Sequence, residues 1–133
     1  MSMVHDNIIL SYRVDFESDT LTLKTQSYLC EQTSEEIDVI FTDYLTHIFC
    51  DEIKGSIIFD VEERSVDFFI KQERKLIENK RNYCWPIHYK ADDVHAELTE
   101  FMHKSQYKAF EISSSYGLNG WVLAKQMEFM LSK

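Results

Sequence analysis

The chain has 133 residues, enough for one domain with a hydrophobic core, and its 44% hydrophobic and 14% aromatic content excludes an intrinsically disordered protein. No apolar run approaches the roughly 20 residues of a membrane-spanning helix, and no basic N-terminal region precedes an apolar one as in a signal peptide. The net charge of −9 disfavours binding to nucleic acid or to anionic membrane surfaces. We therefore predict one soluble, cytoplasmic domain over residues 1–133.

The first half of the chain alternates between apolar and polar residues, a pattern typical of half-buried β-strands. It predicts strands over residues 7–16, 20–30, 36–49 and 55–63. The second half of 36–49 also fits a helix, and we favour a strand with an irregular or bulged end. Short connections between the four strands predict an antiparallel meander.

The spacing of apolar residues changes to a helical period after residue 64. It predicts a helix over residues 65–83 with Ser65 as its N-cap, and a second helix over 92–105 capped by Asp92 or Asp93. Two β-rich segments, 107–115 and 120–131, follow. The predicted fold is α+β: an antiparallel sheet of about six strands in the order ββββ-αα-ββ, with two helices packed on one face.

The segment ISSSYGLNGW, residues 112–121, contains three serines but no catalytic signature. A hydrolase elbow needs Gly-x-Ser-x-Gly before a helix, whereas Ser113 stands where the first glycine belongs and a strand follows. Asn119-Gly120 instead predicts the turn of a β-hairpin. Tyr116 and Trp121 are either core residues or aromatic contacts for a partner.

The remaining candidates for chemistry are also weak. His95 and His103 are eight residues apart, too far along one helix to share a metal ion, so we predict no metal site and no cofactor. The three cysteines (30, 50 and 84) form no Cys-x-x-Cys motif and are read as free thiols in a reducing compartment. We assign no catalytic residue and predict that the protein is not an enzyme.

The negative charge is concentrated in one part of the chain. Residues 31–67 hold eleven acidic side chains and two basic ones, so this segment accounts for the whole net charge. One interpretation is that a low isoelectric point keeps the protein soluble. The other is that the segment attracts a basic partner.

Three segments, GSIIFDVEE, YCWPIHY and SSYGLNGWVLA, carry a resemblance to small acidic proteins of low-GC Gram-positive bacteria. Some proteins of that kind are similar to immunity proteins encoded beside polymorphic or contact-dependent toxins. The resemblance transfers no active-site residue; it implies a binding protein that neutralises a basic toxin, for example a nuclease domain. The residues we predict to bind such a partner are Asp43, Asp51, Glu52, Asp60, Glu62, Glu63, Tyr116 and Trp121.

Two other functions stay open from the sequence. One is a small-molecule-binding or hydrolase-like domain with a pocket between sheet and helices, whose polar groups come from Trp85, His88, Ser114 and Tyr116. The other is a structural or regulatory subunit that pairs an exposed sheet edge with a second copy. The chain is accordingly expected to be a monomer or a homodimer.

Overall fold

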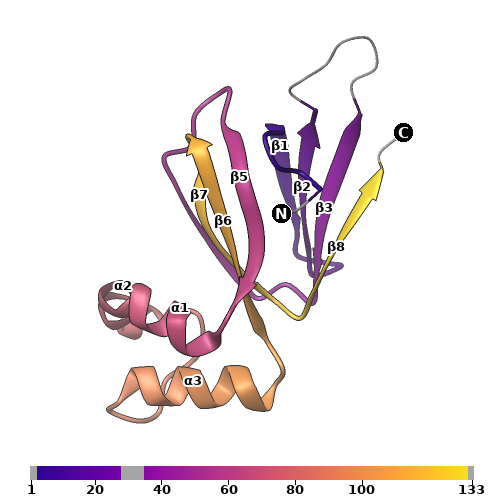
Figure 1. Cartoon of the computed structure of the whole chain (residues 1–133). Coiled ribbons are helices and arrows are strands. Elements are labelled where there is room, and N and C mark those ends of the chain that lie inside the picture. Colours follow the sequence, from indigo (N-terminus) through magenta and orange to yellow (C-terminus); the bar gives the residue numbers. More distant parts are fainter. Residues whose placement is uncertain (1–2, 28–34, 132–133) are drawn as a thin grey trace.

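The computed structural model describes residues 3–27 and 35–131 and has an α+β fold built on an antiparallel sheet (Figure 1). Its strands are β1 (Ile8–Asp15), β2 (Thr20–Gln26), β3 (Glu36–Thr42), β4 (Thr46–Cys50), β5 (Ile57–Arg64), β6 (Lys108–Tyr116), β7 (Asn119–Ala124) and β8 (Gln126–Leu131). Its helices are α1 (Val66–Gln72), α2 (Arg74–Asn79), the 3-10 helix η1 (Arg81–Tyr83) and α3 (Val94–Lys104). The predicted end of the second strand, residues 28–30, lies outside the described residues, as does Glu31.

The strands follow the order β4-β7-β6-β5-β1-β2-β3-β8, and each neighbouring pair is antiparallel. β1, β2 and β3 form an antiparallel meander, but the fourth strand of the predicted meander, β5, lies beside β1 and not next to β3. β1 and β5 share one residue pair, Ile8 with Ile57, flanked by backbone hydrogen bonds from Ile9 to Ser56 and from Ile58 to Asn7. The sheet therefore divides into two four-stranded halves, one made of β4 to β7 and the other of β1, β2, β3 and β8 (Figure 1).

The prediction of about six strands was wrong because two of the predicted strands each break in two. Residues 36–49 form β3 and β4 on either side of Asp43, whose φ is 54°, and residues 120–131 form β7 and β8 on either side of Lys125. β3 pairs with β8 and β4 pairs with β7. The two segments consequently cross together from one half of the sheet to the other, which gives eight strands.

The main hydrophobic core lies between the two halves of the sheet. Leu21, Val39 and Phe41 contribute from one half and are fully buried, and Ile58 and Ile112 contribute from the other. The rings of Phe41 and Phe110 meet across this core with centroids 5.5 Å apart. The alternating apolar residues of β2 and β3 thus face the opposite half, whereas in β1 and β5 the alternation does not hold throughout, since Leu10 and Phe59 are exposed.

Both predicted helix starts are confirmed by side-chain caps. Ser65 Oγ accepts a hydrogen bond from the Phe68 amide at 3.1 Å, and an Asp93 carboxylate oxygen accepts one from the Ala96 amide at 3.1 Å. The predicted helix over 65–83 is interrupted at Glu73 and again at Lys80, giving α1, α2 and η1.

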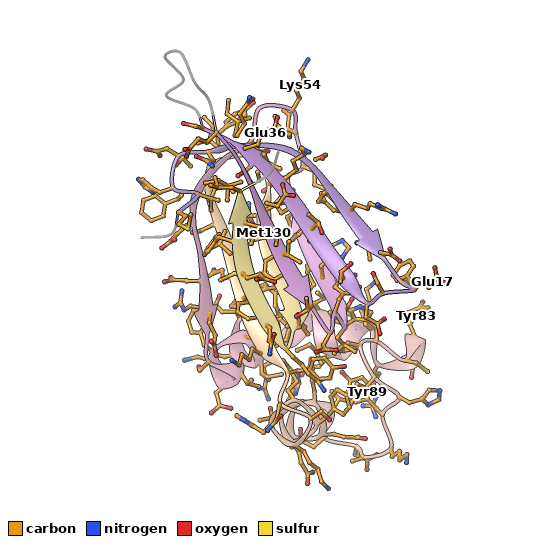
Figure 2. All side chains as sticks on the ribbon, turned by 90° about the vertical axis from the view of Figure 1, so that its right-hand side faces the viewer. Glu17, Glu36, Lys54, Tyr83, Tyr89 and Met130 are labelled. Carbon is orange, nitrogen blue, oxygen red and sulfur yellow. The ribbon has the colours of Figure 1, made fainter. Side chains whose placement is uncertain are left out.

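The helices do not cover one face of the sheet as predicted. They gather at one end of the half formed by β4 to β7, where Phe69, Leu98 and Met102 form a second core with Trp121 and Leu123 of β7 (Figure 1). In Figure 2, which faces the half containing β3 and β8, the helices lie below the strands. Within residues 3–27 and 35–131, no helix has the length and apolar character needed to cross a membrane.

The predicted hairpin between residues 107–115 and 120–131 exists, but its turn is not at Asn119-Gly120. The pairing of Ile112 with Gly120 centres the bend on Tyr116, and Gly117 follows with a φ of 86°. Asn119 and Gly120 belong to β7. A side chain on Gly120 would overlap the backbone carbonyl of Ile48, so glycine is required there by the close approach of β4.

Candidate partner-binding groove

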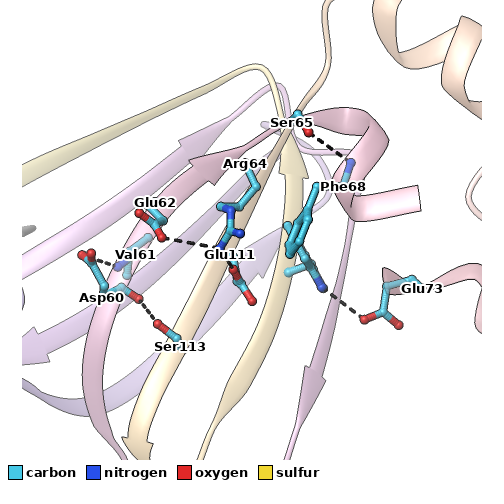
Figure 3. A network of polar contacts seen from close by, with 10 residues as sticks. Asp60, Val61, Glu62, Arg64, Ser65, Phe68, Glu73, Glu111 and Ser113 are labelled. Carbon is cyan, nitrogen blue, oxygen red and sulfur yellow. Dashed lines mark hydrogen bonds and ion pairs between the residues drawn. The ribbon is translucent and has the colours of Figure 1, made fainter. Parts of the chain in front are cut away.

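Two glutamates face each other on the outer surface of β5 and β6. Glu62 of β5 is directly opposite Glu111 of β6, an arrangement of like charges that is unfavourable by itself. Arg64 lies on the same face as Glu62 and offsets this repulsion: its Nη1 is 2.6 Å from Glu111 Oε1 and 3.6 Å from Glu62 Oε2 (Figure 3). The guanidinium also stacks 4.0 Å from the centre of the Phe68 ring, so α1 fixes its position.

A third glutamate is held where α1 meets α2. The indole Nε1 of Trp121 donates a hydrogen bond to Glu73 Oε2 at 3.2 Å. Trp121 is only 4% exposed and packs edge-on against Phe69. Burial raises the pKa of Glu73, the hydrogen bond from Trp121 opposes this rise, and the negative charge of Glu111 adds to it.

These glutamates open onto two adjoining hollows. The first has a volume of about 340 Å³ and is lined by Glu73, Glu111 and Trp121 among others. The second has a volume of about 560 Å³ and is lined by Asp51 and Glu52, together with Tyr116 at the bend of the hairpin. Ser114 and Asn119 line both hollows, so the two hollows are adjacent. We call the two hollows together the acidic groove.

All the charged residues that line the acidic groove are acidic. Glu73, Glu111, Asp51 and Glu52 contribute four carboxylates, and no lysine, arginine or histidine is found among the described lining residues. Arg64 lies beside the groove and is engaged by Glu111 and Glu62. The groove therefore presents an excess of negative charge in a concave surface, where a cationic group is favoured.

The structure gathers several of the predicted partner-binding residues at this groove. Asp51, Glu52 and the half-exposed Tyr116 (51% exposed) line it, while Glu62 contacts it through Arg64. Trp121 lines the groove as a buried core residue, which decides between the two alternatives left open by the sequence.

The other predicted residues lie outside the lining. The backbone carbonyl of Asp60 accepts a hydrogen bond from Ser113, a groove residue, and Glu63 is exposed on β5. Asp43 lies at the break between β3 and β4 and lines a different pocket. The acidic segment 31–67 therefore does not form one surface, because its described residues are distributed over both halves of the sheet.

Sequence reasoning missed Glu73 and Glu111, which lie outside that segment. The alternation in β6 does place Glu111 on the face opposite Phe110 and Ile112, and this signal marks it as outward-facing. Its position opposite Glu62 depends on the strand register, which the sequence does not reveal.

The residues proposed for a small-molecule pocket are not brought together. Ser114 and Tyr116 line the acidic groove, whereas Trp85 packs with the helices and donates from Nε1 to Thr46 Oγ1 at 3.0 Å. His88 is exposed in the connection before α3. Over the described ranges, no group of three or more histidine, cysteine, aspartate or glutamate side chains is arranged to hold a metal ion.

Comparison with known proteins gives no family assignment. No protein-family model matches the sequence, no curated protein is significantly similar to it, and no solved structure matches its fold. The function is therefore inferred from the geometry of the acidic groove.

The raised pKa of Glu73 predicts a specific pH dependence of stability. The pKa of Glu73 in the folded chain is above its usual value of 4.5. At pH values between these two pKa values, Glu73 is protonated in the folded state and ionised in the unfolded state. The contribution of Glu73 to stability should therefore decline as the pH rises from about 4 through its raised pKa, whereas the lowered pKa values of Asp15, Glu97 and His47 act in the opposite direction. We expect Glu73→Gln, which can still accept the Trp121 hydrogen bond, to remove this decline in urea unfolding measured from pH 4 to 7. The matched variant Glu100→Gln, on the exposed surface of α3, should retain it; parallel curves for Glu73→Gln and the wild type would contradict the prediction.

Proposed function

We propose that the protein is a non-catalytic binding protein that recognises a basic protein partner through the acidic groove. The observation that carries this proposal is the lining of four carboxylates without a basic residue. A concave surface of one sign attracts an oppositely charged partner over a distance and orients it before contact.

The groove also offers apolar surface beside its charges. Tyr116 and Ile53 are exposed at its outer end, and the edge of Trp121 lines its inner end. Lysine and arginine side chains combine a charged end with an apolar stem, so they match this combination of carboxylates and aromatic rings. The partner we propose presents a protruding basic segment that enters the groove.

An immunity protein is the kind of binding protein that we propose. Such a protein performs no chemistry on its toxin and needs a stable fold with a complementary surface. A toxin that cleaves nucleic acid carries basic residues that bind the phosphates of its substrate, and a protruding segment with such residues would place them against the carboxylates of the groove. The charge of the groove and the resemblance noted in the sequence both support a protein of this kind.

The test uses the protein encoded by the neighbouring gene as the purified partner. We expect the triple variant Asp51→Asn, Glu52→Gln and Glu73→Gln to weaken binding about a hundredfold, or about 3 kcal/mol, and to reduce the dependence of Kd on salt concentration. Glu52→Gln keeps an acceptor for the Tyr12 hydroxyl, which donates to Glu52 at 2.7 Å. Isothermal titration calorimetry at several salt concentrations measures both effects.

A control with the same change of net charge separates the groove from general attraction. Glu17, Asp92 and Glu100 are exposed and line neither hollow of the groove, so their amide replacements should leave Kd within about threefold of the wild type. Equal weakening by the two triple variants, or none by either, would overturn the proposal that the groove is the binding site.

A further inference from the structure

A third pocket lies where the two crossing segments pass from one half of the sheet to the other. It has a volume of about 590 Å³ and has no lining residue in common with the acidic groove. α3 reaches it with its last turn, and the starts of β6 and β8 complete it. The side chains that can donate hydrogen bonds into it are His103, Gln106, Tyr107, Lys108, Lys125 and Gln126.

The donors of this pocket are not used by the protein itself. Within the described residues, the Lys108 ammonium and the side-chain amides of Gln106 and Gln126 make no hydrogen bond or ion pair. The last carbonyls of α3 do not need them, because those of Met102 and His103 already accept from the backbone amides of Tyr107 and Gln106. The donors are therefore free to bind a ligand.

One aromatic ring organises the basic side of the pocket. The Lys125 ammonium lies 5.1 Å from the centre of the Tyr107 ring, and Phe101 stacks against the same ring. Burial, and then the negative charges of Asp43 and Asp19, raise the pKa of Tyr107, so its hydroxyl remains protonated and able to donate.

The charge of the pocket is opposite to that of the chain as a whole. The lining contains two lysines and one carboxylate, Asp43, in a protein whose net charge is −9; the negative charge of Asp19, outside the lining, also reaches Tyr107. Ammonium and amide groups without a protein acceptor match the oxygens of a phosphate or a carboxylate. We propose that this pocket binds a small molecule carrying a phosphate or carboxylate group, with Lys108 and Lys125 contacting its oxygens.

This site is independent of the groove proposed for a protein partner, and its test needs no partner. Two-dimensional NMR of the full chain, titrated separately with inorganic phosphate and with succinate, should show saturable shifts at the amides of residues 103–108 and 125–126. The stronger of the two anions identifies the chemical class of the ligand.

Paired substitutions locate the anion. We expect Lys108→Gln with Lys125→Gln to abolish the saturable shifts, whereas Lys75→Gln with Lys104→Gln, the same change of charge at exposed positions outside the lining, should keep the Kd of the wild type. Asp43→Asn should tighten binding, because it removes the carboxylate that repels the anion. The proposal is overturned by the absence of saturable shifts with either anion, by equal weakening in both lysine pairs, or by an unchanged Kd in Asp43→Asn.

Discussion

We expect Gly120→Ala to lower the free energy of unfolding by about 4 kcal/mol or more, among the largest losses that one substitution produces. Gly120 lies in β7 between β4 and β6, and an added Cβ would occupy the space of the Ile48 carbonyl on β4. β4 would have to separate from β7, and it carries Ile48 and Cys50, which line the acidic groove. Urea unfolding followed by tryptophan fluorescence measures the loss.

Gly55 provides a matched control for this substitution. It also has a positive φ, of 88°, but no atom lies within 4 Å of the position of an added Cβ. Gly55→Ala should therefore cost only the backbone strain of about 1–2 kcal/mol. Similar losses for the two variants would show that conformation, rather than the contact with β4, requires glycine at position 120.

Phe41→Ala is expected to have the second largest effect, a loss of about 3–5 kcal/mol. Its fully buried ring lies between the two halves of the sheet and contacts Phe110 of the opposite half. Removing it leaves a cavity at the contact that holds the halves together. Phe16→Ala removes the same side chain where it is 79% exposed, and should change stability by less than about 1 kcal/mol. A loss below 2 kcal/mol for Phe41→Ala would show that the halves close over the cavity.

Local patterns were sufficient to predict most elements but not the crossing of the strands. Ser65 and Asp93 cap their helices as predicted, because capping depends on residues within one turn. The breaks at Asp43 and Lys125 were missed because neither position carries a proline or glycine. The strands on both sides of each break contain apolar residues. Hydrophobicity alone therefore does not show that Leu123 packs against the helices while Phe129 packs between the two halves of the sheet. That distinction depends on tertiary packing.

The candidate site was predictable only in part for a related reason. Asp51 and Glu52 were found because acidic residues are dense around them in the sequence. Glu73 and Glu111 come from a helix junction and a strand far apart in the chain, and only the register of β5, β6 and β7 brings them to one groove. The Asn119-Gly120 pair misled the turn prediction because a glycine demanded by close packing looks the same in a sequence as one demanded by a turn.

The pairing of β8 with β3 has a consequence for the order in which the protein can form during synthesis. β1, β2 and β3 are complete by residue 42, but the strand that covers the open edge of β3 is made from residues 126–131. The ribosome adds about 5–20 residues per second, so β3 exposes unpaired backbone groups for several seconds on each nascent chain. Chains growing side by side on one messenger RNA are at risk of pairing through β3 in this interval, and the arrival of β8 ends that risk.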